Sequence, residues 1–204
     1  MATETSVVVP AAELTRNRTL LVGTAFAAAA SIMVFVGLFG IYIAIRQNNE
    51  VLSETPGLRG ELWFPELAVQ IAPGTMMLFT ALMSGFTMAW AVQAIRNDDR
   101  RNAYLALGVT LLLGAAVINQ AAFAISDFGI PVDRSTASLL LYTLYGAFIV
   151  FLTVAMAFVL LMGIRAVAGQ FNSRNADGIE AAAIYWYAVV VVYPVLWYLI
   201  SITK

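Results

Sequence analysis

The sequence predicts an all-α polytopic membrane protein, a five-transmembrane-helix bundle that forms a single membrane domain over residues 1–204. Of its 204 residues, 61% are hydrophobic and 11% are charged, and the mean hydropathy is +0.85. These values lie outside the range of soluble globular domains. Apolar runs of the length that crosses a bilayer, about 20 residues each, lie at about 19–45, 68–95, 103–126, 137–164 and 181–202.

The first run is expected to remain in the mature protein as a transmembrane helix. It is longer than the apolar core of a signal peptide, and the segment before it contains Glu4 and Glu13 rather than a basic cluster. The small residues of "TAFAAAAS" (24–31), together with Gly37 and Gly40, let helix backbones approach closely. They predict a tight interface with another helix of this chain or of a partner.

The second run is preceded by the longest connection, 46–67, which contains the amphipathic stretch "ELWFPE" (61–66). Aromatic side chains in such a stretch settle among lipid headgroups while its acids face water, so we expect it to lie at the membrane interface. Within the second run, Pro73-Gly74 predicts a bend. Trp90 is a candidate helix-packing or lipid contact.

The third run holds the strongest polar candidates within a span, the adjacent Asn119 and Gln120. Facing a neighbouring helix, each amide would contribute about 0.6 kcal/mol of interhelical hydrogen bonding. Structural hydrogen bonding is the favoured interpretation, and a ligand site is the alternative.

The fifth run, "AAAIYWYAVVVVYPVLWYLI" (181–200), contains six Tyr or Trp residues and no ionisable acid, base or His. Trp186 and Pro194 are candidate helix-packing or lipid contacts. Pro194 predicts a bend, because it leaves the Val190 carbonyl without its usual amide donor. A bend opens a crevice, and a crevice lined by aromatic side chains in a bilayer is most simply filled by lipid acyl chains, with a hydrophobic cofactor as the alternative.

Composition excludes several classes of function. The sequence has no Cys and no His, which excludes disulfides, thiol chemistry and nearly every transition-metal site. A net charge of −1, with the cationic residues spread over the loops, argues against nucleic-acid binding. The five span interiors contain no ionisable residue, and no inverted repeat is visible, so a proton relay, an ion path or a transporter is disfavoured.

The distribution of Lys and Arg predicts the orientation, because short loops rich in these residues stay in the cytoplasm. Four cationic residues fall on one side and seven on the other. The N-terminus is therefore expected in the cytoplasm and the C-terminus outside, in a bacterial cell (inner) membrane. The larger group is Arg16, Arg18, Arg96, Arg100, Arg101, Arg165 and Arg174, and the smaller is Arg46, Arg59, Arg134 and Lys204.

Several short stretches together resemble a known family. They are "VGT" (22–24) and "GLFGIY" (37–42) in the first helix, "SGFTMAWAVQAIRNDD" (84–99) in the second, Gln120 in the third and Tyr185-Trp186 in the fifth. In helix count, spacing and these motifs the chain resembles the subunit III proteins of haem-copper oxidases (cytochrome c oxidase subunit III-like), in their short five-helix bacterial form.

The chain departs from the family's pattern at every ionisable signature position. Ser31 stands where the first helix of the family carries Glu, and Phe123 stands where an acid follows the family's Gly-Gln pair. The remaining substitutions replace the two His of Gly-x-His-x-x-His in the fourth helix, and the His and Asp of Tyr-Trp-His-Phe-Val-Asp in the fifth. They are Phe148, Phe151, Tyr187 and Val190.

The resemblance implies a non-catalytic, structural and lipid-binding accessory subunit of a respiratory haem-copper terminal oxidase, which supports aerobic electron transport. It implies that haem and copper lie in partner subunits, that the catalytic subunit I and other subunits of the complex are the partners, and that phospholipid binds between the helices. The alternatives are an accessory subunit of a nitric oxide reductase or of another membrane metalloenzyme complex, and a stand-alone membrane transporter.

Overall fold

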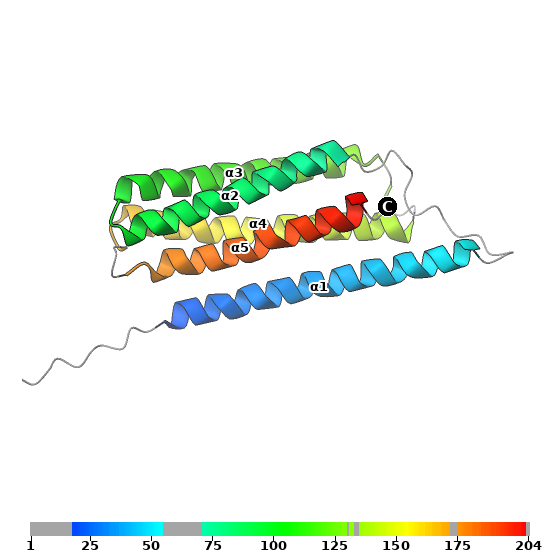
Figure 1. The fold of residues 1–204 in the computed structure, drawn as a ribbon, viewed down its shortest axis with the longest axis horizontal. Coiled ribbons are helices and arrows are strands. Elements are labelled where there is room, and N and C mark those ends of the chain that lie inside the picture. The colour runs from blue at the N-terminus through cyan, green and yellow to red at the C-terminus, as the bar shows by residue number, and fades with distance from the viewer. Residues whose placement is uncertain (1–17, 55–70, 130, 133–134, 172–174, 203–204) are drawn as a thin grey trace, which may run out of the picture.

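The computed structural model describes residues 18–54, 71–129, 131–132, 135–171 and 175–202, and these residues form a bundle of long α-helices without strands (Figure 1). This confirms the predicted all-α class. The helices are α1 (Thr19–Glu54), α2 (Ile71–Arg96), α3 (Arg100–Asp127), α4 (Thr136–Val167) and α5 (Asp177–Trp197), with a π-helical turn, η1 (Tyr198–Ile202), at the end of α5. All five α-helices are long and apolar enough to cross a membrane.

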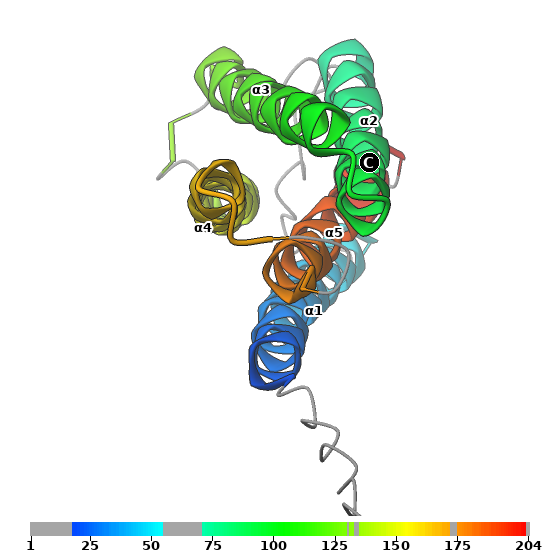
Figure 2. The same ribbon diagram turned by 90° about the vertical axis from the view of Figure 1, so that its left-hand side faces the viewer.

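Helix α5 lies in the middle of the bundle. It packs against α1, α2 and α4, while α3 packs against α2 and α4. In both views α1 lies on the opposite side of α5 from α3 (Figures 1 and 2). In the most apolar window of α5, 56% of the residues are buried, against 28–33% in the other helices. The aromatic helix of the sequence is therefore the core of the fold.

Helix α1 continues past the predicted end of its apolar run to Glu54. Its 36 residues span about 54 Å at 1.5 Å per residue, whereas the hydrocarbon core is about 30 Å thick. The polar extension is supported by an ion pair within one turn, in which Arg46 Nε lies 3.1 Å from Glu50 Oε1. The predicted interfacial stretch 61–66 lies outside the described residues.

Local signals set the ends of the other helices. The Asp99 side chain caps α3 by accepting the Asn102 backbone amide at 3.1 Å, and Ser135 and Ser138 form a capping box at the start of α4. Pro73 and Gly74 lie in α2, and the bend that the sequence predicts there stays a prediction.

Pro194 lies inside α5, near its end, and the bend that the sequence predicts there stays a prediction. The Tyr198 amide donates to both the Pro194 and Val195 carbonyls, and the chain then widens into the π-helical turn. Proline removes one amide donor from the ladder, and π-helical turns are a known cause of local helix distortion. Within this π-helical turn the Leu199 carbonyl accepts the hydroxyl of Tyr42 of α1 at 3.4 Å.

Replacing Gly178 by alanine is expected to lower the free energy of unfolding by about 1–3 kcal/mol. A β-carbon at Gly178 would lie 2.5 Å from Phe171 Cζ and 3.0 Å from Met162 Sδ, and Phe171 is itself buried. The better helix propensity of alanine offsets only about 1 kcal/mol. Unfolding of the detergent-solubilised protein in a denaturing-detergent titration measures the change.

The matched control is Gly146→Ala, because a β-carbon at Gly146 meets no atom within 4 Å. This variant is expected to be as stable as the parent chain or slightly more stable. Equal stability of the two variants would show that Phe171 does not hold its position against Gly178.

Candidate functional site

The six substituted signature positions do not form one cluster. Phe148 (1% exposed), Val190 (6%) and Ser31 (7%) are buried, Phe151 and Tyr187 are half-buried, and Phe123 is 58% exposed on the outside of α3. Five of the six positions therefore have their side chains wholly or partly within the bundle, and none of these side chains is an acid, a base or an imidazole.

Ser31 joins α1 to α5. Its hydroxyl donates to the Ala27 carbonyl at 2.9 Å and lies 3.2 Å from the Tyr185 hydroxyl. Since serine has one hydroxyl proton, the Tyr185 hydroxyl is the donor in the second bond. Where the family pattern has a carboxylate, this chain has a neutral hydrogen bond between helices.

A double-mutant cycle with Ser31→Ala and Tyr185→Phe is expected to give a coupling of about 0.6 kcal/mol, and no more than about 1.7 kcal/mol, the range of interhelical hydrogen bonds in membranes. Each single variant and the double variant are unfolded in the same detergent system. Additive effects of the two changes would show that the hydroxyl pair does not stabilise the contact between α1 and α5.

Each of the two Phe residues of α4 packs against an aromatic ring of a neighbouring helix. The Phe151 ring lies 5.2 Å from the Phe35 ring of α1, and the Phe148 ring lies 5.2 Å from the Tyr193 ring of α5. Both pairs are tilted, a favourable arrangement for aromatic rings. These positions therefore pack α4 against its neighbours.

Tyr187 and Val190 face α2. A β-carbon added to Gly85 would lie 3.9 Å from Val190 Cγ1 and 4.0 Å from Tyr187 Cε1, which is ordinary van der Waals contact. The two positions that are ionisable in the family pattern here form an apolar contact between α5 and α2.

Trp186 is the central contact of the bundle. It is fully buried, its indole Nε1 donates to Ser84 Oγ at 3.2 Å, and a β-carbon at Gly114 would lie 2.6 Å from its Cη2 and 3.2 Å from Met156 Sδ. One side chain therefore touches α2 through Ser84 and reaches the glycine of α3. Gly114 makes room for this ring.

The two adjacent amides of α3 lie in different environments. Gln120 Nε2 donates to Thr80 Oγ1 of α2 at a long 3.4 Å, and Gln120 Oε1 is buried with no hydrogen-bond partner among the described residues. Asn119 is exposed on the outer side of α3. Of these two amides, Gln120 is the one that forms a hydrogen bond to a neighbouring helix within the described residues. Trp90 is 45% exposed on α2, where it faces outward.

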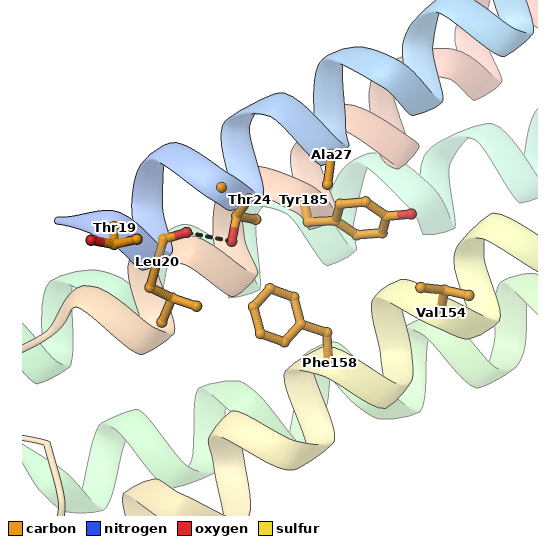
Figure 3. Close-up of a pocket in the computed structure, with 8 residues that line it drawn as sticks. Thr19, Leu20, Thr24, Ala27, Val154, Phe158 and Tyr185 are labelled. Atoms are coloured by element: carbon orange, nitrogen blue, oxygen red, sulfur yellow. Dashed lines mark hydrogen bonds between the residues drawn. The ribbon is translucent and has the colours of Figure 1, made fainter.

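A groove of about 600 Å³ lies between α1, α4 and α5 (Figure 3). Within it the Thr24 hydroxyl donates to the Leu20 carbonyl at 2.8 Å, so the polar atom of this threonine is satisfied by its own helix. The surface that remains is apolar, apart from the hydroxyls of Thr19 and Tyr185. The groove is lined by Thr19, Leu20, Gly23, Thr24, Ala27, Val154, Phe158 and Tyr185.

Sequence reasoning did not single out Tyr185, Phe158 or Ser84 as site residues. Each is a residue type that is common in transmembrane helices. Its role depends on a contact with a distant segment, such as the Ser31–Tyr185 pair. The signals that could have found two of them were the "YW" pair of the fifth run, which begins at Tyr185, and the family-like stretch 84–99, which begins at Ser84.

The buried polar residues of the described bundle share one type of polar group. All of them carry hydroxyls: Thr24, Ser31, Ser84, Thr110, Ser138 and Ser201. The described residues contain no group of three or more His, Cys, Asp or Glu that could hold a metal ion.

Comparison with known proteins gives a consistent result. The family model described as "Cytochrome c oxidase subunit III" matches residues 6–203. "Cytochrome c oxidase subunit 3" of Pongo abelii is 30% identical over 180 residues, which are 82% of this chain and 63% of that protein. The protein of the same name from Coturnix japonica is 30% identical over 175 residues, 80% of this chain and 61% of that protein. The chain thus spans less than two thirds of the length of these relatives.

Proposed function

The chain belongs to the cytochrome c oxidase subunit III family, and from this premise we propose that it is a non-catalytic accessory subunit of a respiratory haem-copper terminal oxidase. In this role it supports aerobic electron transport while its partners carry out the redox chemistry. The observation that carries the proposal is the family match, which covers residues 6–203 and so extends over all five helices.

The residue types of the chain support a non-catalytic role. Protein ligands of haem iron and copper are mainly imidazole, thiolate and thioether groups; the sequence contains neither His nor Cys, and its eight Met residues supply only the thioether. Ionisable side chains inside a membrane usually mark proton or ion paths, whereas the buried polar residues described here carry only hydroxyls. We therefore assign haem and copper to partner subunits, with the catalytic subunit I as the main partner.

The groove between α1, α4 and α5 is the proposed lipid-binding site. Its lining is uncharged and nearly all apolar, which fits an acyl chain. Arg18, exposed at the start of α1, directly precedes the first lining residue, Thr19. An arginine at the end of an apolar groove is placed to bind the phosphate of a lipid whose chain fills that groove.

The outer surface supports a role as a subunit. Asn119 is exposed on α3, between the exposed apolar side chains Leu112 and Phe123. An amide is unfavourable against lipid tails and readily hydrogen-bonds across helices. We propose that a helix of a partner subunit covers this part of α3.

The proposed location is a bacterial cell membrane with the N-terminus in the cytoplasm. Among the described residues, Arg18, Arg96, Arg100, Arg101 and Arg165 occupy the ends of helices that meet on one side of the bundle (Figure 1). A concentration of arginine at one membrane face favours the cytoplasmic side.

Purification of the tagged protein in a mild detergent tests the function. The reduced-minus-oxidised optical spectrum and mass spectrometry of the accompanying chains are recorded together. Stoichiometric haem and a haem-copper oxidase subunit I are expected. A nitric oxide reductase catalytic chain would reassign the partner, and a protein that purifies alone and colourless would contradict the proposal.

A further inference from the structure

A second groove, of about 320 Å³, lies between α3 and α4 and shares no lining residue with the groove at α1. It opens on the outer surface of the bundle, since Gly108, Leu160, Ile164 and Val167 are exposed. Its lining consists of Tyr104, Leu107, Gly108 and Leu111 of α3, with Leu160, Gly163, Ile164 and Val167 of α4.

Two glycines open this groove, one on each helix. A β-carbon at Gly108 or at Gly163 would meet no atom within 4 Å, so larger side chains at these positions would fill the space. At one end the Tyr104 hydroxyl donates to the Ala166 carbonyl at 3.0 Å, which ties α3 to α4. The groove is thus an apolar channel with a tyrosine at the end nearest the aqueous phase.

Two arginines stand beyond that tyrosine. Arg100 and Arg101 precede Tyr104 by one turn, and residues three and four apart lie on the same side of a helix. Both are exposed, and neither guanidinium has an ion-pair partner within the described ranges. Arginine binds phosphate through paired N–H donors and can reach the membrane surface from a helix end.

The other charged groups near this end already have partners within the chain. The Asp99 carboxylate accepts two hydrogen bonds from Asn102, one from the backbone amide at 3.1 Å and one from the side-chain amide at 2.6 Å. Arg165 Nε donates to Gln170 Oε1 at 2.8 Å. Arg96 Nε lies 3.0 Å from Glu180 Oε1. Among the described residues, Arg165 is held by the neutral Gln170 amide and by the Phe171 ring, whereas no side-chain partner is seen for Arg100 and Arg101, so these two are the cations at the groove most open to an anionic group.

We propose that the groove between α3 and α4 binds one phospholipid with an anionic headgroup. One acyl chain lies along the groove over Gly108 and Gly163, and the headgroup phosphate accepts hydrogen bonds from Arg100 and Arg101. This site is additional to the groove at α1 and does not depend on the oxidase assignment. Basic positions at the cytoplasmic ends of grooves between transmembrane helices suit anionic headgroups.

Native mass spectrometry of the full-length protein tests the site. The protein is first exchanged into micelles that contain equal amounts of phosphatidylglycerol and phosphatidylcholine of the same chain length. The parent protein is expected to retain one phosphatidylglycerol in preference to phosphatidylcholine. In the Arg100→Gln/Arg101→Gln variant the ratio of retained phosphatidylglycerol to retained phosphatidylcholine should fall roughly ten-fold. In Arg46→Gln, which lies at the opposite end of the bundle, this ratio should stay unchanged.

A second pair of variants separates groove binding from surface charge. Gly108→Leu fills the groove and is expected to lower the number of retained phosphatidylglycerol molecules by one. Gly37→Leu adds the same side chain on the exposed side of α1, where a β-carbon meets no atom within 4 Å. This variant should retain as many phosphatidylglycerol molecules as the parent protein. Lipid bound at the groove near Arg18 persists in both variants, so the two sites are counted separately.

Equal retention of the two lipids by the parent protein would overturn the proposal, and so would unchanged retention in Gly108→Leu. A third outcome also overturns the proposal. If Gly108→Leu keeps its lipid but no longer purifies with a protein that accompanies the parent chain, the groove binds a helix of a partner protein.

Discussion

Replacing Trp186 by alanine is expected to lower the free energy of unfolding in detergent by about 3–5 kcal/mol, the usual cost of removing a large buried aromatic side chain. Trp186 is fully buried, its indole donates to Ser84 Oγ, and its ring lies against Gly114. In a bilayer the main loss is packing, because the cavity leaves its lining atoms without contacts. A denaturing-detergent titration measures the change.

Two controls identify the source of the effect. Trp186→Phe keeps a ring but removes the indole donor, and a loss of about 1 kcal/mol is expected for a single hydrogen bond. Trp90→Ala removes the same side chain from a position that is 45% exposed, and its effect should stay within about 0.5 kcal/mol. A small effect of Trp186→Ala, similar to that of Trp90→Ala, would contradict the central position of Trp186.

Introducing aspartate at Val190, where the family pattern has an acid, is expected to destabilise the protein by about 3 kcal/mol. Val190 is 6% exposed and packs near Gly85, so the carboxyl group would enter an apolar contact between α5 and α2. A carboxyl group without hydrogen-bond partners is costly in such a place. Unfolding of Val190→Asp in detergent measures the cost.

Val190→Thr is the matched control. It places a hydroxyl at the same site, and this hydroxyl can donate a hydrogen bond to a backbone carbonyl of its own helix. Thr24, Thr110 and Thr153 each donate a hydroxyl to the carbonyl four residues earlier. This variant should lose much less stability than Val190→Asp. Equal losses would indicate that shape, rather than polarity, limits this position.

The same position tests the functional claim. The double variant Tyr187→His/Val190→Asp restores both ionisable groups of the family pattern in α5. If the chain is purely structural, the purified complex should show no gain in proton-coupled activity, measured as protons moved per electron. A marked gain would count against a purely structural role for α5.

The sequence predicted the number and type of helices because a bilayer demands long apolar runs, and each run is bounded by charged or turn-forming residues. The resemblance supplied the family. The extension of α1 was not visible, because its polar residues carry no apolar signal and are supported by the local ion pair between Arg46 and Glu50.

The sequence could not separate the lipid-facing side chains from those inside the bundle, since both environments are apolar. Phe123 is 58% exposed and Phe148 is 1% exposed, although both are phenylalanines within apolar helices. Asn119 and Gln120 show the same limit. Adjacent residues point in different directions around a helix, so only tertiary structure decides that Gln120 reaches Thr80.

The pairing of distant residues was also beyond the sequence. Ser31 and Tyr185 are separated by 154 positions, and neither belongs to a motif that names the other. The same holds for Trp186 and Gly114, whose contact exists because α3, α4 and α5 pack together around one ring. These contacts follow from the arrangement of the helices.

The central claim is that this chain supports an oxidase without taking part in its chemistry. Oxygen consumption per haem, measured through prolonged turnover for the complex purified with and without this chain, tests it most directly. The account predicts equal initial rates and a faster loss of activity in the complex that lacks the chain. An initial rate that collapses as soon as the chain is removed would show that it supplies a catalytic step.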